Sequence, residues 1–308
     1  MNSIHIMNED KRKLYFNILQ VGAGANGGQF FRSLCQDIAT HFISFNNNPG
    51  NDQVQFGMNL TICDRDVYEP KNLANQLCTQ EDMDEYKVIA LAERYADVYD
   101  LSVKTVTEYI KDFSMLDQFL KAPSLDEAYQ HVYVLVGMID NNKTRQLFHD
   151  YFYSEEVDNL IWIDTGVTGV EMQSEYSDEE EANIRESGFS GQAVVGFKYN
   201  GHVILEPVTD MFPNILDDAA THFPDESCGE VIINNPQRSS TNKMAALIAN
   251  NIMNNLFHSQ RIFNHVLNFN AQLCASGGRT SFIKDYQLQK WEEVKQYTKR
   301  EGMDYGTS

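Results

Sequence analysis

The sequence lacks an apolar run long enough to cross a membrane. Its longest hydrophobic stretches are of strand length, whereas a membrane-spanning helix needs about 20 apolar residues. The amino-terminal stretch, MNSIHIMNEDKRK, also lacks the apolar segment of a secretory signal peptide. We therefore expect a cytoplasmic protein with no membrane partner.

Cysteine is scarce and scattered. The 308 residues include five cysteines, an odd number, and none of them forms a Cys-x-x-Cys pair. A disulfide framework needs paired cysteines and a structural zinc site needs closely spaced ones, so the pattern argues against both. The eight histidines show no i, i+4 pair with a third ligand beside it, and the sequence therefore predicts no zinc-type centre.

Positive charge is also in short supply. Lysine and arginine number 24 against 44 aspartates and glutamates, which gives a formal net charge of −20 at pH 7. Such an excess repels phosphate backbones and anionic lipids, so we expect no nucleic acid as main partner. An anionic nucleotide would bind only where a metal ion and a few cations offset the field. An acidic surface that simply keeps the protein in solution explains the same composition.

A glycine-rich turn separates the first strand pattern from the first helix pattern. The apolar run 16–21 is followed by Gly22, Gly24 and Gly27, after which apolar residues recur at helical spacing. Glycines let a turn bend sharply and let its amides approach an anion, while the helix start supplies unpaired N–H groups. The pattern predicts a phosphate-binding turn of the kind found in NAD, FAD, S-adenosylmethionine and ATP binders. A plain turn without ligand is the alternative.

Strand and helix patterns alternate through the first half of the chain. Strands are expected at 16–21, 58–64, 101–106, 132–137 and 160–165, and helices at 81–98, 112–120 and 141–153. This alternation predicts a Rossmann-like α/β fold, a mostly parallel twisted sheet with helices on both faces and ligands at the carboxyl ends of the strands. Beyond Gly166, a hairpin at Asn200-Gly201 predicts antiparallel strands that extend the sheet, followed by a long helix at 240–257.

Two acidic residues follow the second strand. Asp64 ends this strand, where Rossmann proteins place an acid for ribose hydroxyls, and Asp66 follows at once. Gly28 and Asp64 are 36 residues apart, more than in a dinucleotide fingerprint, because a polar loop lies between them. Since Asp-x-Asp is also common in surface turns, a functional role depends on the blocks that follow.

Three further blocks follow in order. Asn-Leu-x-x-Gln runs from Asn72 to Gln76, Lys87 lies in the next helix pattern, and Asp140-Asn-x-x-x-Arg145 follows the fourth strand. With the glycine turn and the Asp-x-Asp, the blocks number five, and their order is more specific than any one of them.

These five blocks occur in the order of a known superfamily. From Phe16 to about Phe257 the sequence resembles ubiquitin-activating enzymes and the bacterial ThiF and MoeB proteins. IWIDTGVTG, GQAVVG and PDESCGE are most similar to ThiF-type proteins of the bacterial PRTRC gene cluster. The resemblance implies an N-terminal segment at 1–15, a ThiF-like adenylation domain at 16–270 with halves 16–166 and 167–270, and a C-terminal tail at 271–308.

The resemblance also implies a role for each block around ATP and Mg²⁺. The turn glycines would line the phosphates, Asp64 would hold the ribose with Asp66 beside it, Asn72 and Gln76 would flank the nucleotide, Lys87 would offset phosphate charge, Arg145 would lie near the nucleotide, and Asp140 would bind Mg²⁺. In the family's reaction, the C-terminal glycine carboxylate of a small ubiquitin-like β-grasp protein attacks the α-phosphate of ATP. The products are an acyl-adenylate and pyrophosphate. A homodimer and a conjugating-enzyme-like acceptor are further partners that the resemblance implies.

One position departs from the family's pattern. The family usually has arginine before the glutamine of the Asn-Leu block, and this sequence has Asn75. That arginine reaches the leaving phosphates, a task for which asparagine has no charge. Arg65 and Arg145 are the candidates to replace it.

Cys228 is the candidate for a second step. Ser227-Cys228 stands where ThiF-type proteins of the PRTRC kind have a Ser-Cys pair, so the resemblance implies transfer of the activated glycine to Cys228 as a thioester. The neighbouring Asp225, Glu226 and Glu230 would raise the pKa of this thiol, which favours the alternative of a structural cysteine.

Two other functions stay open at the level of sequence. One is a non-catalytic ThiF-like protein that binds ATP or a ubiquitin-like partner, a reading that Asn75 favours. The other is a Rossmann oxidoreductase that uses NAD. It would use the glycine turn and Asp64 but would leave Lys87 and Asp140 without a role.

Overall fold

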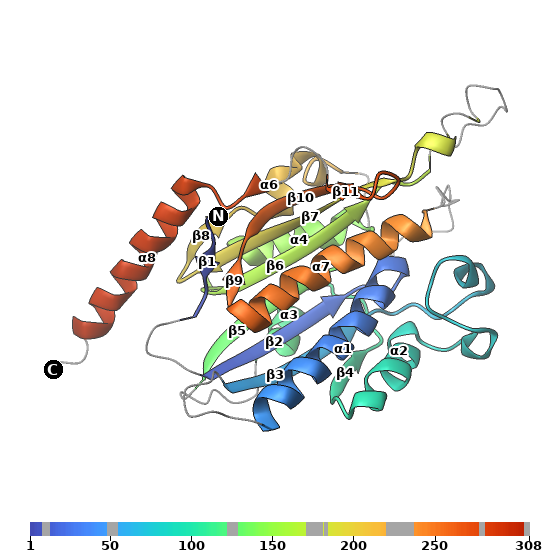
Figure 1. Ribbon diagram of the computed structural model, residues 1–308, viewed down its shortest axis with the longest axis horizontal. Coiled ribbons are helices and arrows are strands. Elements are labelled where there is room, and N and C mark those ends of the chain that lie inside the picture. The colour runs from blue at the N-terminus through green and yellow to red at the C-terminus, as the bar shows by residue number, and fades with distance from the viewer. Residues whose placement is uncertain are drawn as a thin grey trace.

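A mixed sheet of ten strands forms the centre of the protein (Figure 1). The computed structural model describes residues 1–7, 13–47, 55–121, 129–170, 181, 184–219, 237–276 and 281–304. Within these residues the strands of the sheet follow the order β11-β10-β7-β6-β5-β2-β3-β4, with β8 paired to β7 and β12 paired to β10. A separate two-stranded ribbon joins β1 to β9.

The elements have the following bounds. The strands are β1 Ile4–His5, β2 Lys13–Val21, β3 Gln55–Cys63, β4 Val103–Val106, β5 Gln130–Gly137, β6 Leu160–Val167, β7 Ser190–Tyr199, β8 His202–Leu205, β9 Arg261–Ile262, β10 Asn264–Asn270, β11 Ala275–Ser276 and β12 Ser281–Phe282. The α-helices are α1 Ala25–Asn47, α2 Lys87–Tyr95, α3 Phe113–Leu120, α4 Asn142–Tyr153, α6 Val208–Met211, α7 Ser239–Ser259 and α8 Asp285–Asp304. Short 3-10 helices are η1 Pro70–Ala74, η2 Gln80–Asp82, η3 Asp97–Tyr99 and η4 Pro213–Ile215.

The central strands are parallel and end level with one another. In the register of the sheet, Val21 at the end of β2 lies opposite Cys63 of β3 and Gly137 of β5, each the last residue of its strand. The segments that follow these three strands therefore leave the sheet at the same edge. In parallel α/β sheets this carboxyl edge is where ligands bind.

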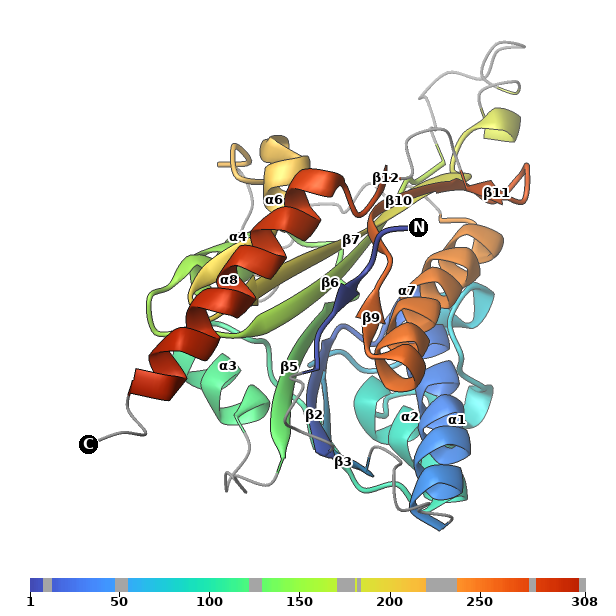
Figure 2. The same cartoon turned by 60° about the vertical axis from the view of Figure 1, so that its left-hand side comes forward.

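Helices cover both faces of the sheet and create two hydrophobic cores. Figures 1 and 2 show α1, α2 and α7 on one face and α3 and α4 on the other. Because side chains alternate along a strand, Phe16 and Ile18 of β2 join the first core, whereas Leu19 and Val21 join the second. Burial of both strand faces explains why the sequence at this position is mostly apolar, with Asn17 and Gln20 as buried polar exceptions.

Antiparallel strands extend the parallel part, as the sequence predicts. β7 pairs antiparallel with β6, β8 and β10. Asn200 and Gly201 form its turn to β8 with φ of 46° and 75°, the positive values that a tight hairpin requires. The predicted Rossmann-like fold with a mostly parallel sheet and antiparallel additions is therefore confirmed, while the domain division at residue 166 stays a prediction.

α8 lies beside the antiparallel part of the sheet (Figure 2). Trp291 of this helix is 1% exposed and packs against the rings of Phe197 and Tyr199 of β7. His265 of β10 lies 3.0 Å from the amide nitrogen of Gln287, which ties the start of α8 to the sheet.

Two predicted element boundaries are wrong. The helix expected at 81–98 is α2 alone, flanked by η2 and η3, because Asp82 accepts the backbone N–H of Thr79 and Asp84 adopts a φ of 66°. α1 continues to Asn47, into the polar stretch that was expected to be a loop. None of the described helices combines the length and apolarity needed to span a bilayer.

Candidate functional site

The glycine turn packs against the end of β5. Gly22 has a φ of 99°, and a Cβ atom there would lie 2.3 Å from the carbonyl oxygen of Met138. A Cβ atom on Gly27 would lie equally close to the carbonyl oxygen of Gly22. The space beside Gly24, in contrast, is open to 4 Å. Two glycines are thus required by the packing of the backbone, and the third leaves free room over the turn.

Side chains from β2 and β3 fix the turn in place. Buried Gln20 donates from its amide nitrogen to the carbonyl oxygens of Gly22 and Gly27, both at 2.9 Å. Asp64 accepts the backbone N–H of Ala23 at 2.7 Å and that of Asp66 at 2.8 Å. Burial, followed by the charge of Asp66, raises the pKa of Asp64 above its usual value. The conformation of the turn is therefore held by the protein itself.

Lys87 and Asp66 form an ion pair at the same edge. The Lys87 ammonium lies 2.9 Å from the Asp66 carboxylate, and the exposed fractions of the two side chains are 7% and 48%. Tyr109, which follows β4, donates its hydroxyl to the other Asp66 oxygen at 2.7 Å. Burial acts to raise the pKa of Asp66, but the Lys87 charge and these hydrogen bonds outweigh it and lower the pKa.

Sequence reasoning selected Lys87 and Asp66 separately and missed both their contact and Tyr109. Tyr109 lies between the strand predicted at 101–106 and the helix predicted at 112–120, and it belongs to none of the motifs. Arg65, between the two aspartates, is exposed, and its guanidinium lies 5.7 Å from the centre of the Tyr109 ring. A cationic and aromatic group therefore borders the edge beside Asp64.

Asn72 and Gln76 lie in and just after the 3-10 helix η1. Asn72 accepts the backbone N–H of Glu69 at 2.8 Å and so completes a capping box, which explains its burial. Gln76 has a buried side-chain oxygen with no hydrogen-bond donor in the part of the chain that the structure describes. Asn75 ends η1 and is partly buried. Capping of η1 therefore explains the asparagine at position 72 by local structure, a role that the motif did not indicate.

Asp140 and Arg145 belong to one segment but point in different directions. Asp140 is exposed, and none of the described side chains pairs with its carboxylate. Asn141 caps α4 by accepting the backbone N–H of Thr144 at 2.9 Å. Arg145 is 7% exposed, and its Nε lies 2.9 Å from Asp164 of β6. The structure thus directs Arg145 into the protein and leaves Asp140 at the surface of the carboxyl edge.

Neither a cysteine site nor a metal centre can be described from the structure. Cys228, with its neighbours, lies outside the described residues. Across the described ranges, no group of three or more His, Cys, Asp or Glu side chains is arranged to hold a metal ion.

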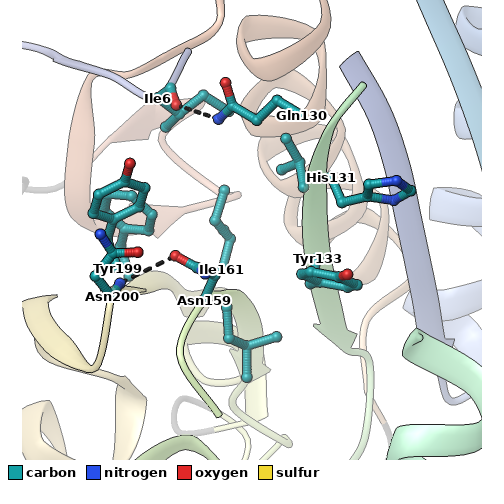
Figure 3. A pocket seen from close by; sticks show the side chains of 11 residues that line it. Ile6, Gln130, His131, Tyr133, Asn159, Ile161, Tyr199 and Asn200 are labelled. Atoms are coloured by element: carbon teal, nitrogen blue, oxygen red, sulfur yellow. Dashed lines mark hydrogen bonds between the residues drawn. The ribbon is translucent and has the colours of Figure 1, made fainter. Parts of the chain in front are cut away.

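A cavity of about 150 Å³ lies at the opposite end of the sheet. Its lining includes Gln130 at the start of β5, Asn159 and Asn200 (Figure 3). The backbone N–H of Asn200 donates to the side-chain oxygen of Asn159. Gln130 is further occupied by a hydrogen bond to the carbonyl oxygen of Ile6. Because this cavity adjoins the amino end of β5, it is separate from the site at the carboxyl edge.

Comparison with known proteins gives a family and a fold. A model of the ThiF family matches residues 10–273. Among solved structures, selenomethionyl PaaA is similar with a TM-score of 0.51 and 12% identity over 88% of this chain and 65% of its own. E. coli MccB with succinimide gives a TM-score of 0.50 and 11% identity over 87% of this chain and 65% of its own. The chain spans less than two thirds of either protein, and no curated protein matches it.

Proposed function

Because the chain belongs to the ThiF family, we propose that it is an ATP-dependent adenylyltransferase that activates the C-terminal glycine carboxylate of a small ubiquitin-like protein. Three features at one sheet edge support the proposal: the glycine turn, the Lys87 ammonium and the Asp140 carboxylate. The observation that carries it is the level register of β2, β3 and β5, since the three features follow or contact the ends of these strands.

The open space over Gly24 suits a triphosphate. The turn precedes the first residues of α1, and the partial positive charge of a helix start favours an anion. The N–H of Gly27 donates to the Asn26 side chain and that of Gly28 to the carbonyl oxygen of Gly24, so an anion would meet the N–H groups that precede these two. Gln20 and Asp64 hold this turn in one conformation. In the proposal, Gly22, Gly24 and Gly27 line the phosphates, and Asp64 and Asp66 lie on the ribose side. Gln76 contributes its unsatisfied oxygen beside the nucleotide.

The charge balance of the site favours a nucleotide that arrives with a divalent cation. Asp64, Asp66 and Asp140 outnumber the cations Arg65 and Lys87, and the protein as a whole carries −20. Mg²⁺ prefers oxygen ligands and is held in nucleotide sites by one or two carboxylates together with the phosphates. Asp140, exposed and unpaired among the described residues, fits this role. The ion would neutralise charge that develops on the triphosphate.

The proposed reaction needs alignment more than acid-base chemistry. An oxygen of the acceptor carboxylate forms a bond to the α-phosphorus, the bond from that phosphorus to the bridging oxygen breaks, and pyrophosphate leaves with the electron pair. Since the carboxylate is already ionised at neutral pH, no base is required. The rate then depends on positioning and on fixed charge near the phosphates. Lys87 supplies that charge from a side chain that is nearly excluded from water.

The two arginines that could supply the charge missing at Asn75 lie in different surroundings. Arg145 is committed to Asp164, whereas Arg65 is exposed at the carboxyl edge next to Asp64. We therefore assign to Arg65 the charge that would otherwise meet the leaving phosphates. Arg65→Ala should lower pyrophosphate release more than Asn75→Ala does, and equal effects would argue against the assignment.

Binding and exchange assays test the proposed function. Calorimetry with α,β-methylene-ATP should show binding that requires Mg²⁺ and is lost on chelation. With an acceptor, for which a β-grasp protein ending in glycine and encoded beside this gene is the first choice, labelled pyrophosphate should be incorporated into ATP. Asp140→Asn should abolish exchange. Mg²⁺-dependent ATP binding without exchange for any such acceptor would favour the non-catalytic alternative, and binding of NAD instead of ATP would favour the oxidoreductase.

The thioester step and the homodimer are further parts of the proposal. Cys228→Ser should retain pyrophosphate exchange but form no thiol-sensitive adduct with the acceptor; an adduct that persists in this variant would remove Cys228 from the mechanism. Light scattering tests the homodimer by the mass of the protein in solution. A conjugating-enzyme-like acceptor would appear as a second protein that takes the activated glycine from the adduct.

A further inference from the structure

A buried ion pair joins α4 to β6 behind the proposed site. Arg145 and Asp164 are 7% and 1% exposed, and Nε of the arginine lies 2.9 Å from the carboxylate. Removing two charges from water is costly, and a buried pair is often no more stabilising than apolar residues of similar size. The pair therefore calls for an explanation beyond stability.

The Arg145 guanidinium also forms hydrogen bonds with the backbone, one of them to the residue directly before Asp140. Nη2 of Arg145 donates to the carbonyl oxygen of Ile139 at 2.6 Å and to that of Thr165 at 3.1 Å. Ile139 follows the end of β5 and directly precedes Asp140. One rigid planar group thus binds the segment that follows β5 and the last part of the neighbouring strand β6, and Asp164 fixes the orientation of that group.

A glycine at the end of β5 leaves room for the Asp164 carboxylate. Gly137, the last residue of β5, lies opposite Asp164 in the register of the sheet. A Cβ atom on Gly137 would lie 2.5 Å from the second carboxylate oxygen of Asp164. A glycine at this position is what allows the ion pair to fit against the strand from which the Asp140 segment leaves.

The same segment is in contact with the glycine turn. The backbone N–H of Met138 donates to the carbonyl oxygen of Val21, the last residue of β2, at 2.8 Å, and a Cβ atom on Gly22 would lie 2.3 Å from the carbonyl oxygen of Met138. The side chain of Asn26, in the first turn of α1, donates to the hydroxyl of Thr165 at 3.2 Å. Residues 138–140 are therefore held between the turn on one side and the Arg145 guanidinium on the other.

We propose that Arg145 is a positioning residue: paired with Asp164, it fixes residues 138–140 so that the Asp140 carboxylate meets the nucleotide-bound metal ion at the correct place relative to the glycine turn. The inference rests on the proposed function and assigns to Arg145 no contact with the nucleotide. Positioning errors of about 1 Å can lower enzymatic rates by about 100-fold, so a device of this kind has a measurable effect.

The test removes both charges together. Arg145→Met combined with Asp164→Asn leaves no unpaired buried charge, so the double variant is expected to fold. The measurement is the Mg²⁺ concentration that gives half-maximal binding of α,β-methylene-ATP. We expect this concentration to rise about 10-fold or more, while the melting temperature stays close to that of the wild type. A double variant with the wild-type Mg²⁺ requirement would overturn the inference.

Lys198→Met is the matched control. Lys198 is also a buried cation, 3% exposed, that donates to a backbone carbonyl, that of Ser154 at 2.8 Å. It lies opposite Leu160 at the amino end of β6, away from the carboxyl edge. This variant should leave the Mg²⁺ requirement unchanged. If the double variant does not fold, Arg145→Lys, which keeps the charge but loses the planar fork, is measured in its place with the same expected result.

A cycle with Asp140 shows whether Arg145 acts through that carboxylate. In an Asp140→Asn background, the Arg145 and Asp164 changes should add little further loss of Mg²⁺-dependent nucleotide binding, because the group they position is already gone. Fully additive losses would mean that the ion pair acts elsewhere and would overturn the inference alone. Failure of the wild-type protein to bind the nucleotide with Mg²⁺ would instead overturn the proposed function and the inference with it.

Discussion

The ammonium group of Lys87 lies 2.9 Å from the carboxylate of Asp66, and the two side chains differ sharply in exposure, 7% against 48%. Lys87 starts α2, while Asp66 follows β3, so the pair joins a helix start to a strand end. The pair keeps the ammonium at the carboxyl edge, and Asp66 stays accessible to solvent. Under the proposed function, a phosphate group would compete with Asp66 for this ammonium.

Replacing Lys87 should weaken nucleotide binding without unfolding the protein. Lys87→Met keeps the apolar stem that packs in the protein and removes only the charge. A hydrogen bond to a charged group contributes about 1.5 to 3 kcal/mol, so the dissociation constant of Mg²⁺-ATP should rise about 10- to 100-fold. Calorimetric titration measures this change. Lys121→Met is the control, because Lys121 forms a surface ion pair with Asp117 at the end of α3 and should leave the affinity unchanged.

Gly24, Gly27 and Gly28 should respond differently to substitution by alanine. Gly27→Ala places a Cβ atom 2.3 Å from the carbonyl oxygen of Gly22 and should destabilise the protein by about 1 to 3 kcal/mol. Gly24→Ala meets no atom within 4 Å and should fold normally but lose ATP affinity, since the methyl group enters the space proposed for the phosphates. Gly28→Ala, whose nearest neighbour would be 3.6 Å away, is the control for both properties.

Thermal melting and nucleotide titration of the three variants separate these effects. Normal ATP affinity in Gly24→Ala would place the phosphates elsewhere. Normal stability in Gly27→Ala would contradict the close packing of the turn.

Acidification should loosen the attachment of α8 through His265. Burial lowers the pKa of His265, which donates from Nε2 to the carbonyl oxygen of Glu206 and accepts at Nδ1 from Gln287. The charge of Lys284 also lowers this pKa, while Glu206 opposes it. In the unfolded chain the imidazole binds its proton near pH 6.5, before the folded protein does. The stabilising contribution is therefore present above that pH and is lost as the pH falls toward the folded pKa.

Chemical denaturation at pH 7.5 and pH 5.5 measures this contribution. The drop in unfolding free energy on acidification should be smaller in His265→Gln than in the wild type, by at most about 1.4 kcal/mol, because pH 5.5 lies about one unit below the pKa of histidine in the unfolded chain. His202, which is exposed, provides the control variant His202→Gln. An equal drop in the wild type and His265→Gln would show that other groups dominate.

Trp291 should be required for the docking of α8 but not for nucleotide binding. It is 1% exposed and packs against the rings of Phe197 and Tyr199. Truncating a buried tryptophan costs about 3 to 5 kcal/mol. Trp291→Ala should therefore expose α8 to limited proteolysis at a temperature where the wild type resists, while ATP affinity is retained. Loss of affinity in the folded variant would mean that α8 communicates with the carboxyl edge.

The alternation of apolar segments was sufficient to predict the fold class. β2, β5 and β6 are buried on both faces, so their sequences are predominantly apolar and do not alternate between apolar and polar residues. The hairpin at Asn200-Gly201 was equally predictable, because few other residue pairs accept two positive φ angles. The extent of α2 was not predictable. It depends on the hydrogen bond of Thr79 and the ion pair of Arg94 with Asp82, and the periodicity of apolar residues does not indicate such contacts.

Motif order selected the candidate site residues one by one but could not indicate the contacts among them. Motif order selected Asp66 and Lys87, yet their ion pair depends on how α2 packs against the end of β3. Arg145 shows the limit most clearly. Its position in the Asp-Asn-x-x-x-Arg block suggests a nucleotide contact, while its actual partner, Asp164, lies 19 residues later on another strand. Tyr109 belongs to no motif, so only the fold brings it to Asp66.

Gln20 gives the turn a property that affects the speed of binding. Its amide bridges the carbonyl oxygens on both sides of the bend, so the protein itself fixes the shape of the loop. Under the proposed function, association of a nucleotide with this loop would be governed by diffusion and by the repulsion between a polyanion and an acidic protein. Raising the ionic strength should therefore accelerate association, the reverse of what cationic nucleotide sites show.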